Sequence, residues 1–387
     1  MRFLIGCTEV CGLIRTYADQ LKAQGHDVIT ISDKHAFFDY KYTFSFSNIS
    51  YEYFESLGVF KKLFLRYSEH KEKKDPDYRK RLILRSLMGS FDVYFFIWNG
   101  LINMQELFKT LKKANKKIIV FFLGDDVRYF PAFSQQYDVS NWTFPKEYTN
   151  RPLFQQLMKL RTAEKYADLI YSVPDQMGLA QRSYDHLWIP IDITRFTFKN
   201  NKRKVPKVIH LPSEPYMKGS DVIMRTLSEL KEEGLQFEME FKSKIPHEEV
   251  KSLLVEADIL VDEIVFHGPG VLAFEAMASG CAVATNHYTE YSSIFNPPLC
   301  SINKDNIKGK LRELIDNYDL RQTLIEKGIE FVRTNNNPSK IVNDILSNLE
   351  NRKQNGEYSP NFYTKHYVKN TNENAIFNEI NKILEFD

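Results

Sequence analysis

The sequence predicts an α/β protein with two parallel sheets, each covered by helices on both faces. Short apolar runs alternate with longer amphipathic segments along most of the 387 residues. A continuous apolar run indicates a strand that is buried on both faces, and strands alternating with helices indicate a parallel sheet. A polar, basic stretch at 199–204 interrupts the alternation, so we place a domain boundary there.

The first domain is expected over residues 1–200. Apolar runs predict its strands at 3–5, 28–31, 93–97, 118–122, 169–173 and 187–189. A helix is expected over 13–24, because Gly25 follows it as a C-terminal stop. These elements together make one doubly wound, Rossmann-like domain.

The second domain is expected over residues 205–355 and repeats the alternation. Its strands are predicted at 208–211, 237–241, 259–261 and 282–285, and its closing helices at about 304–317, 320–333 and 339–352. One more helix is predicted at 372–384, in a tail of about 360–387. We expect this tail to pack back on the first domain.

The composition argues against several classes of protein. A net charge of +2 gives no case for binding nucleic acid through bulk electrostatics. The 4 cysteines are too scattered for a disulfide framework, and Cys7 and Cys11 lack the second pair of a zinc site, so no metal is expected. No signal-peptide pattern follows Met1, and no apolar run reaches the ~18 residues of a membrane span. We expect a cytoplasmic protein, either free or peripheral at the inner face of the membrane.

A basic segment at 59–85 allows two interpretations. Apolar residues such as Val59, Phe60 and Leu63 interleave there with Lys61, Lys62 and further cations. The first interpretation is a solvated helix face with a core stripe. The second is a surface that binds an anionic membrane leaflet.

Two loops of the second domain carry groups that suit an anion. Lys218 and Gly219 end the loop after the strand at 208–211, and a Gly-Pro-Gly turn at 268–270 precedes a helix. A lysine and the free backbone N–H groups of a helix N-terminus together make a diphosphate site. Glu275, one turn into that helix, can accept hydrogen bonds from the two hydroxyls of a ribose. The second domain is therefore expected to bind a nucleotide.

Several motifs of the chain, taken in order, resemble one known family. Residues 210–219 read H-L-P-S-x4-K-G, and residues 257–283 contain A-D-I-L-V-D-E and G-x4-E-A-M-A-S-G-C-A-V. Upstream lie A-E-K-Y-A-D-L-I-Y-S-V at 163–173 and L-G-D-D-V-R at 123–128. The set resembles a bacterial branch of the family-4 retaining glycosyltransferases over about residues 90–335. This resemblance implies the GT-B fold, in which two Rossmann-like domains with parallel sheets face each other across a cleft.

The resemblance implies roles for particular residues of the second domain. Lys218 would bind the diphosphate of a sugar donor, and Glu275 would bind the ribose of the same donor. The donor would be a UDP- or GDP-type nucleotide sugar, with no further cofactor. The other residues expected around the donor are Ser213, Gly219, Ile245, Gly268, Gly270, Val271 and Leu272.

The resemblance also implies an acceptor side in the first domain. Gly12 would lie there in the loop after the first strand, with Asn99 and Gly100 after the strand at 93–97. Asp126 and Arg128 would lie near the transferred sugar or the acceptor, and the alternative for this pair is a structural ion pair in a loop. The acceptor would be a glycan or a lipid-linked glycan, in the synthesis of a bacterial surface polysaccharide or glycoconjugate.

Three positions depart from the family pattern. His267 stands where the family often has a first glutamate that contacts the sugar, Ser213 stands where many members have arginine, and Leu123 replaces a frequent histidine. His267 is expected either to donate a hydrogen bond to a sugar hydroxyl or to be a neutral loop histidine with no chemical role.

The leading hypothesis is a metal-independent hexosyltransferase that retains anomeric configuration, the last point being implied by the resemblance alone. Its catalytic set would comprise Lys218, Glu275, Asp126, Arg128 and His267. The three departures motivate an alternative, a catalytically silent GT-B protein that partners an active transferase. A dinucleotide-dependent oxidoreductase is rejected, because the first loop lacks G-x-G-x-x-G between Gly6 and Gly12.

Overall fold

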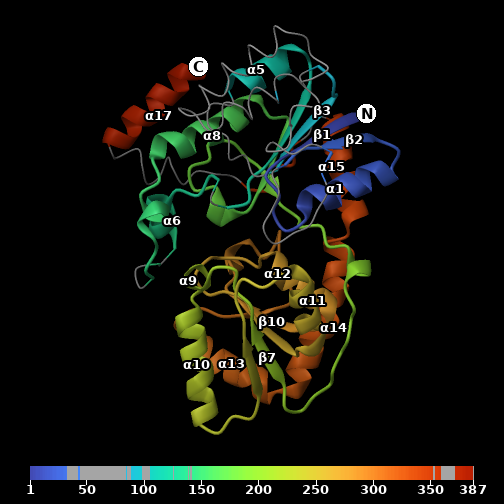
Figure 1. The fold of residues 1–387 in the computed structure, drawn as a ribbon. Coiled ribbons are helices and arrows are strands. Elements are labelled where there is room, and N and C mark those ends of the chain that lie inside the picture. The colour runs from blue at the N-terminus through green and yellow to red at the C-terminus, as the bar shows by residue number, and fades with distance from the viewer. Residues whose placement is uncertain are drawn as a thin grey trace, which may run out of the picture. The chain divides into compact units, whose positions relative to one another are not determined.

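The computed structural model forms two compact units (Figure 1). The first comprises Met1–Tyr137, Glu147–Leu187 and Val342–Asp387, and the second comprises Asp138–Lys146 and Trp188–Ile341. The structure describes residues 1–32, 42–43, 84, 89–97, 105–124, 126–137, 139, 142–351, 354–358 and 371–386. The polar stretch 199–204 lies inside the second unit, whose long segment begins at Trp188.

The first unit contains a parallel sheet in the order β2-β1-β3-β4-β5-β6. Its strands are β1 (Arg2–Cys7), β2 (Asp27–Thr30), β3 (Val93–Ile97), β4 (Lys117–Phe121), β5 (Leu169–Ser172) and β6 (Asp185–His186). The chain moves outward from β1 to β2 and then returns to place β3 on the other side of β1, so the topology reverses between β1 and β3.

Helices of the first unit follow the strands. They are α1 (Leu13–Ala23), α5 (Gln105–Lys113), α6 (Phe130–Gln136), α7 (Lys146–Thr149) and α8 (Leu153–Tyr166), with a 3₁₀ turn at Pro174–Gln176. The core is aromatic: the ring of Phe121 stacks between those of Phe95, at 4.6 Å, and Tyr171, at 4.9 Å. Such stacked pairs add about 0.5–1.5 kcal/mol each to the burial of their area.

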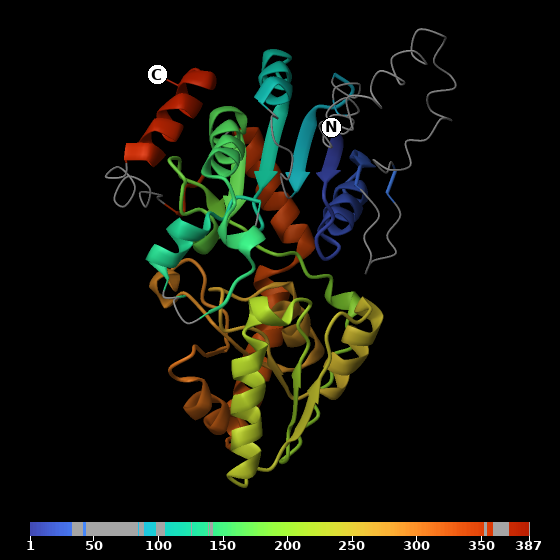
Figure 2. The ribbon, with the colours of Figure 1, turned by 60° about the vertical axis from the view of Figure 1, so that its left-hand side comes forward.

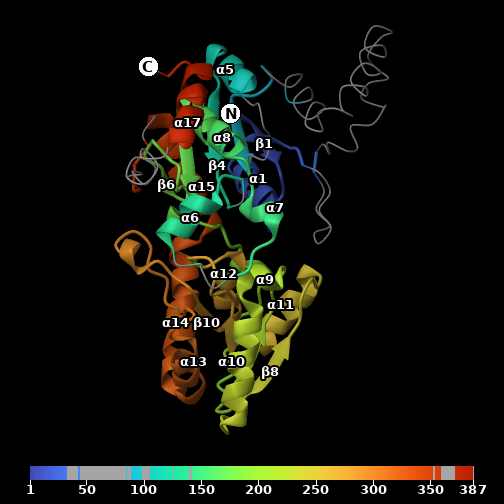
Figure 3. The same cartoon turned by 90° about the vertical axis from the view of Figure 1, so that its left-hand side faces the viewer.

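The C-terminal part of the chain belongs to the first unit. Helix α15 (Pro338–Asn351) begins in the second unit and continues into the first from Val342. Helix α17 (Thr371–Ile383) packs along α8, as Figure 3 shows in red and green. Asn381 of α17 accepts a hydrogen bond from Nε of Arg161 at 3.1 Å, and Phe386 stacks 3.8 Å from the same guanidinium.

The second unit contains another parallel sheet, in the order β11-β10-β9-β7-β8. Its strands are β7 (Lys207–His210), β8 (Glu238–Phe241), β9 (Ile259–Val261), β10 (Ala282–Thr285) and β11 (Cys300–Ser301). Its helices are α9 (Pro215–Lys218), α10 (Ser220–Glu232), α11 (His247–Glu256), α12 (Val271–Ser279), α13 (Ile307–Asp316) and α14 (Tyr318–Asn335), with 3₁₀ turns at Ile193–Arg195 and Thr289–Tyr291.

Helices cover both faces of this second sheet. Ile223 and Leu227 of α10 share a buried cluster with Leu311 of α13 and with strand residues such as Val208 and Ile259. Helices α12 and α14 pack on β10. Figure 2 shows α10, in yellow-green, and α11, in yellow, on either side of the strands. The α/β class with two parallel sheets is therefore confirmed.

The predicted strand at 187–189 is wrong. The strand at this edge is β6, Asp185–His186, whose buried residues are polar. Oδ1 of Asp185 accepts from the backbone N–H of Gly356 at 2.6 Å, and Nδ1 of His186 lies 2.8 Å from the hydroxyl of Tyr358. Because the two strand residues are polar and their partners come from a distant part of the chain, a search for apolar runs does not detect β6. The short strand β11 was also not predicted.

The remaining predicted strands lie within one residue of the observed bounds at most ends, and the predicted helices lie within three. In the parts of the chain that the structure describes, no helix combines the length and the apolar character that a membrane crossing requires.

Candidate functional site

The topology of the second unit places two loops together. Strand β7 pairs with β9 on one side and with β8 on the other, so the chain reverses direction across the sheet between β7 and β9. In open parallel sheets ligands bind at the carboxyl ends of the strands beside such a reversal. The loops after β7 and β9 are those that carry Lys218 and the Gly-Pro-Gly turn.

The first loop is held tightly at Gly219. This residue has φ of 73°, and a Cβ there would lie 2.6 Å from Cγ1 of Ile264 and 3.0 Å from the ring of Trp142. Glycine is required because both the left-handed backbone and the close approach exclude a side chain. The backbone N–H of Ile264 also donates to the carbonyl of Lys218 at 3.2 Å. The loop after β7 is therefore fixed against the loop after β9.

Lys218 forms ion pairs with two carboxylates directly after β9. Its Nζ lies 3.1 Å from Oδ1 of Asp262 and 2.9 Å from Oε2 of Glu263, whose side chains are 1% and 7% exposed. Burial disfavours the ammonium ion, but the two carboxylates outweigh this effect and raise the pKa of Lys218 above its ordinary value. Lys218 is therefore a fixed positive charge.

The N-terminus of α12 lies beside this charge. A Cβ on Gly270, the residue before α12, would lie 3.9 Å from Nζ of Lys218 and 3.9 Å from Oδ2 of Asp262. The first backbone N–H groups of a helix have no intrahelical acceptor, and the helix dipole is positive at this end. Gly270, Val271 and Leu272 lie at this end, and the structure brings Gly270 close to Lys218.

Gly268 shapes the turn before α12. It has φ of 101°, and a Cβ there would lie 2.6 Å from the ring of Tyr288. Its backbone N–H donates to the carbonyl of Asn286 at 3.1 Å. The turn therefore approaches the chain after β10 closely, which explains the need for glycine.

Glu275 lies on the fifth residue of α12 and is 6% exposed. Its Oε1 accepts a hydrogen bond from Nε2 of His247 at 2.8 Å. An ionised carboxylate only accepts, so the proton of this bond is on the histidine. His247 is the first residue of α11, and no sequence pattern pointed to it.

His267 lies in the loop between β9 and α12 and is a neutral histidine. Burial, with a smaller effect from His287, lowers the pKa of His267 to about 4. A neutral imidazole can donate or accept a hydrogen bond but offers no positive charge to a phosphate.

His210, which begins the H-L-P-S motif, is a buried structural residue. Its Nδ1 lies 2.7 Å from the carbonyl of Val261 on β9, and its Nε2 lies 2.7 Å from Oγ of Ser220 on α10. Burial is the main cause that lowers the pKa of His210 to about 4. The side chain links β7, β9 and α10 below the loop that carries Lys218.

The loop after β8 reaches the same end of the sheet. Ile245 is half-buried in this loop, and Nζ of the preceding Lys244 lies 3.4 Å from Oε1 of Glu214 in the loop after β7. Ser213, next to Glu214, is exposed. Both expected residues are thus carried by loops at the carboxyl ends of their strands.

In the first unit, Gly12 lies at the reversal between β1 and β3. It is the N-cap of α1 with φ of 79°. Glu9 in the same loop is 2% exposed and accepts from the backbone N–H of Ile14 at 3.3 Å, and burial raises the pKa of Glu9 above its ordinary value. Asn99 and Gly100 lie outside the described residues, as does the basic segment 59–85 except Leu84.

The structure places Arg128 in the interior of the first unit. Its guanidinium is 2.9 Å from Oδ2 of Asp175 and 3.2 Å from the hydroxyl of Tyr148, and the two charged side chains are 8% and 2% exposed. Asp126 is buried as well and accepts from the backbone N–H groups of Leu123 and Gly124 at 3.2 and 3.0 Å. Burial raises the pKa of Asp126 to about 6. The structure therefore pairs Arg128 with Asp175, not with Asp126.

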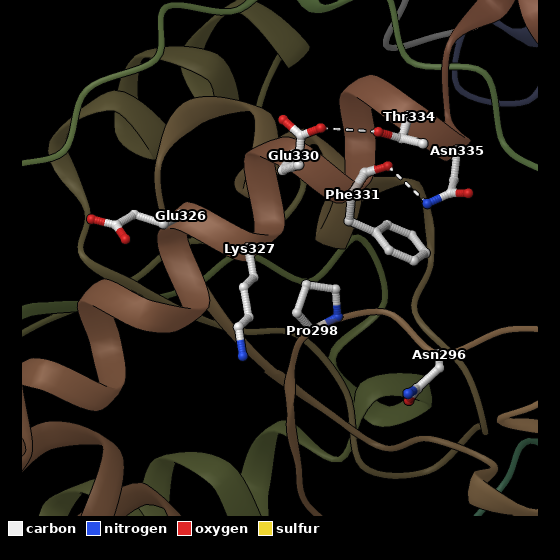
Figure 4. A pocket seen from close by; sticks show the side chains of 8 residues that line it. All are labelled: Asn296, Pro298, Glu326, Lys327, Glu330, Phe331, Thr334 and Asn335. Carbon is white, nitrogen blue, oxygen red and sulfur yellow. Dashed lines mark hydrogen bonds between the residues drawn. The ribbon is translucent and has the colours of Figure 1, made fainter.

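A separate open pocket of about 540 Å³ lies on α14 and the chain before β11 (Figure 4). Its wall includes Lys327, Phe331 and Pro298, and within it Oγ1 of Thr334 donates to Glu330 at 3.2 Å. None of the expected site residues lines this pocket. It is therefore distinct from the loops after β7 and β9.

The two sheets and their helices match the GT-B fold of known glycosyltransferases. Sucrose-phosphate synthase from Thermosynechococcus elongatus superposes with a TM-score of 0.59 at 12% identity, covering 91% of this chain and 99% of that one. WaaG, a glycosyltransferase involved in lipopolysaccharide biosynthesis, gives 0.53 at 15% identity, covering 89% and 99%. An alpha-glucosyltransferase in complex with UDP-glucose and DNA gives 0.53 at 12% identity, covering 90% and 99%.

Residues 221–347 match the family model described as glycosyl transferase-like. The match includes His247, His267, the turn before α12 and Glu275, and it begins just after Lys218. The chain therefore carries a glycosyl transferase-like domain in a GT-B fold. No curated protein sequence matches the chain.

Asp262, Glu263 and His247 are the residues of this site that the sequence analysis missed. Acidic residues directly after a fully apolar strand are a signal that could have found Asp262 and Glu263. His247 is 28 residues from its partner in the chain, and only the packing of α11 on α12 brings the two together.

Proposed function

We propose that the protein is a nucleotide-sugar-dependent glycosyltransferase whose donor binds at the loops after β7 and β9. One observation carries the proposal. The ammonium of Lys218 lies against the N-terminus of α12, and Glu275 follows about 7 Å along the same helix axis. This spacing fits a diphosphate at Lys218 and a ribose at Glu275. We propose a donor of UDP or GDP type.

The positive groups of the site suit departure of a nucleoside diphosphate. When the bond to the sugar breaks, negative charge grows on the β-phosphate and positive charge on the sugar ring. The ammonium of Lys218 and the N–H groups of α12 are fixed before the reaction, so they stabilise the leaving group without reorganisation. We accordingly propose a metal-independent transfer. Retention of configuration and hexosyl transfer are further parts of this proposal, taken from the family resemblance.

The acceptor that we propose is a glycan or a lipid-linked glycan of a bacterial surface polysaccharide or glycoconjugate. WaaG, of the same fold, is described as acting in lipopolysaccharide biosynthesis. We propose a cytoplasmic location, at the inner face of the membrane if the basic segment 59–85 binds anionic lipid. We do not propose nucleic acid as an acceptor, because the net charge of +2 offers a polyanion little attraction.

The second candidate function is a catalytically silent partner of an active transferase. It is favoured by His267, which is neutral where the related enzymes often have a glutamate, and by the two carboxylates that neutralise Lys218. Such a protein would bind a nucleotide or a partner without transferring a sugar.

A thermal-shift panel with UDP, GDP, ADP and their sugars tests the proposal. A ligand at 100 times its Kd stabilises the folded protein by about 2.7 kcal/mol, so one nucleotide is expected to raise the unfolding temperature. Release of nucleoside diphosphate from the matching sugar donor, lost in Lys218→Ala and Glu275→Ala, would exclude the silent partner. The absence of any shift would contradict both nucleotide binding and transfer.

A further inference from the structure

We propose that His247 is a positioning residue, which holds Glu275 in the orientation that recognises the ribose of the donor. The inference rests on the proposed function and extends it to a residue on a different helix. It assigns the selectivity for a ribonucleotide to a pair of side chains, one from the start of α11 and one from the first half of α12.

The geometry of the pair is specific. Nε2 of His247 lies 2.8 Å from Oε1 of Glu275, a distance typical of a strong hydrogen bond to a carboxylate. The glutamate side chain is 8% exposed and the histidine side chain 20% exposed, so the bond is shielded from most water. Figure 1 shows α11 and α12 side by side at this end of the unit.

A glutamate needs such a partner if it is to select a ligand. Its side chain has several rotatable bonds, and ordering it at the moment of binding costs free energy. The bond from His247 engages Oε1, and among the described residues it is the one side-chain hydrogen bond that Glu275 makes. The second oxygen, Oε2, is therefore left to accept a ribose hydroxyl, with the carboxylate already oriented.

The alternative, that His247 serves only to anchor α11, is weaker. Leu253 and Leu254 of α11 are buried at 7% and 0% exposure and hold the helix on the core. An ion pair from Lys242, which follows β8, to Glu249 of α11, at 2.8 Å, also attaches the helix to the loop after β8. The helix has anchors at several points, whereas Glu275 has the single bond from His247.

The chemical consequence is a preference for ribose over deoxyribose. The hydroxyl groups at C2′ and C3′ donate to the carboxylate, and a hydrogen bond to a charged group contributes enough to bias binding by about tenfold to a hundredfold. If His247 orients the carboxylate of Glu275, removal of His247 lowers this preference for ribose. Binding of the phosphates and the base should not change, because Lys218 and α12 remain as they are.

The test is calorimetric titration of the full-length protein with paired nucleotides. The probes are UDP with 2′-deoxy-UDP and 3′-deoxy-UDP, and GDP with the corresponding deoxy forms. The variants are His247→Phe, which removes the donor, and His247→Gln, which retains a donor of similar reach. Glu275→Ala serves as the reference for loss of the hydrogen-bond acceptor.

We expect the wild type to bind one ribonucleotide about tenfold to a hundredfold more tightly than its deoxy analogues. In His247→Phe this ratio should fall to about threefold or less, with the Kd of the deoxy analogues unchanged, and His247→Gln should restore part of the ratio. Glu248→Gln, on the same helix but paired with Lys251, is the control and should match the wild type.

Two results would overturn the inference. The ratio could stay at its wild-type value in both His247 variants, or ribose and deoxyribose forms could lose affinity equally, as a general disturbance of α11 would produce. A failure of the proposed function looks different, since the wild type would then bind none of the nucleotides. His247→Leu also removes the donor, and it takes the place of His247→Phe if that variant does not fold.

Discussion

The loops after β7 and β9 in the second unit differ sharply from the loop after β4 in the first. In the second unit, Lys218 and Gly270 lie in the chain segments that follow strands β7 and β9, at the carboxyl end of the sheet. Glu275 lies in α12, the helix that Gly270 precedes. In the first unit, Arg128 forms a buried ion pair with Asp175, and Asp126 is bound by the backbone of its own loop. We therefore interpret the family-like motif as a ligand site in one unit and as a structural loop in the other.

The difference shows what separates a charged motif residue that can bind a ligand from one with a structural role. Lys218 is a ligand candidate because a helix N-terminus lies beside it and an anion would add to the charges already present. Both cations have buried carboxylate partners, Asp262 and Glu263 for Lys218 and Asp175 for Arg128, so the helix N-terminus and not the ion pair distinguishes Lys218. The predictions that follow test this contrast, beginning with the largest expected effect.

Removal of Arg128 should unfold the first unit more easily without changing donor binding. In Arg128→Met the carboxylate of Asp175 is left buried without its cation, which typically costs about 3–5 kcal/mol. Chemical denaturation would measure the loss, and calorimetry would measure the Kd for UDP and GDP. Weaker nucleotide binding with unchanged stability would place Arg128 in the site and remove the contrast.

Removal of Lys218 should act on the reaction and, because Asp262 and Glu263 lose their buried cation, on stability as well. Lys218→Ala is expected to lower kcat/KM for the nucleotide sugar by about 10²–10³, because one fixed positive group at the leaving phosphate is lost. Lys218→Arg keeps the charge and should retain more activity. Lys310→Ala, which changes an exposed lysine on α13, is the control. Equal rates in Lys218→Ala and wild type would contradict the assignment of the donor diphosphate.

The histidines of the second unit predict a pH effect on stability. The pKa of His267 is lowered in the folded state to about 4, so the unfolded chain binds more protons as the pH falls below about 6.5. Stability is therefore present above this pH and is lost as the pH falls toward 4. The share of His267 is about 1–2 kcal/mol between pH 7 and pH 5.

Unfolding curves of wild type and His267→Gln between pH 7 and pH 5 measure that share. The variant should show a shallower loss of stability with acid, since glutamine does not titrate. Identical pH profiles would contradict the lowered pKa of His267.

The smallest effect is expected at Glu263. Its carboxylate lies 2.9 Å from Nζ of Lys218 and repels the diphosphate that we place there. Glu263→Gln should therefore bind UDP or GDP about threefold to tenfold more tightly, and Asp262 still holds the lysine. Calorimetry at low and moderate salt would test this. Weaker binding in Glu263→Gln would mean that the carboxylate is needed to orient Lys218.

Much of the fold was predictable because it follows from local patterns. Strand β9 is a fully buried apolar run, and α1 ends where Gly25 adopts φ of 81°, a position that favours glycine. Lys218, Gly270 and Glu275, which we propose for the donor, could be named because the order of the residues shows where strand, loop and helix begin. Strand β6 was not predictable, since Asp185 and His186 are stabilised by residues of the segment 354–358.

The sequence by itself determined the α/β class, the two parallel sheets and the residues that end the strands β7 and β9. Only the tertiary structure decided which side chains meet: Lys218 with Asp262, 44 residues away, His247 with Glu275, 28 residues away, and Arg128 with Asp175. The reason is physical. Strands, caps and turns depend on neighbours in the chain, whereas a buried charge takes its partner from whichever element the sheet order places beside it.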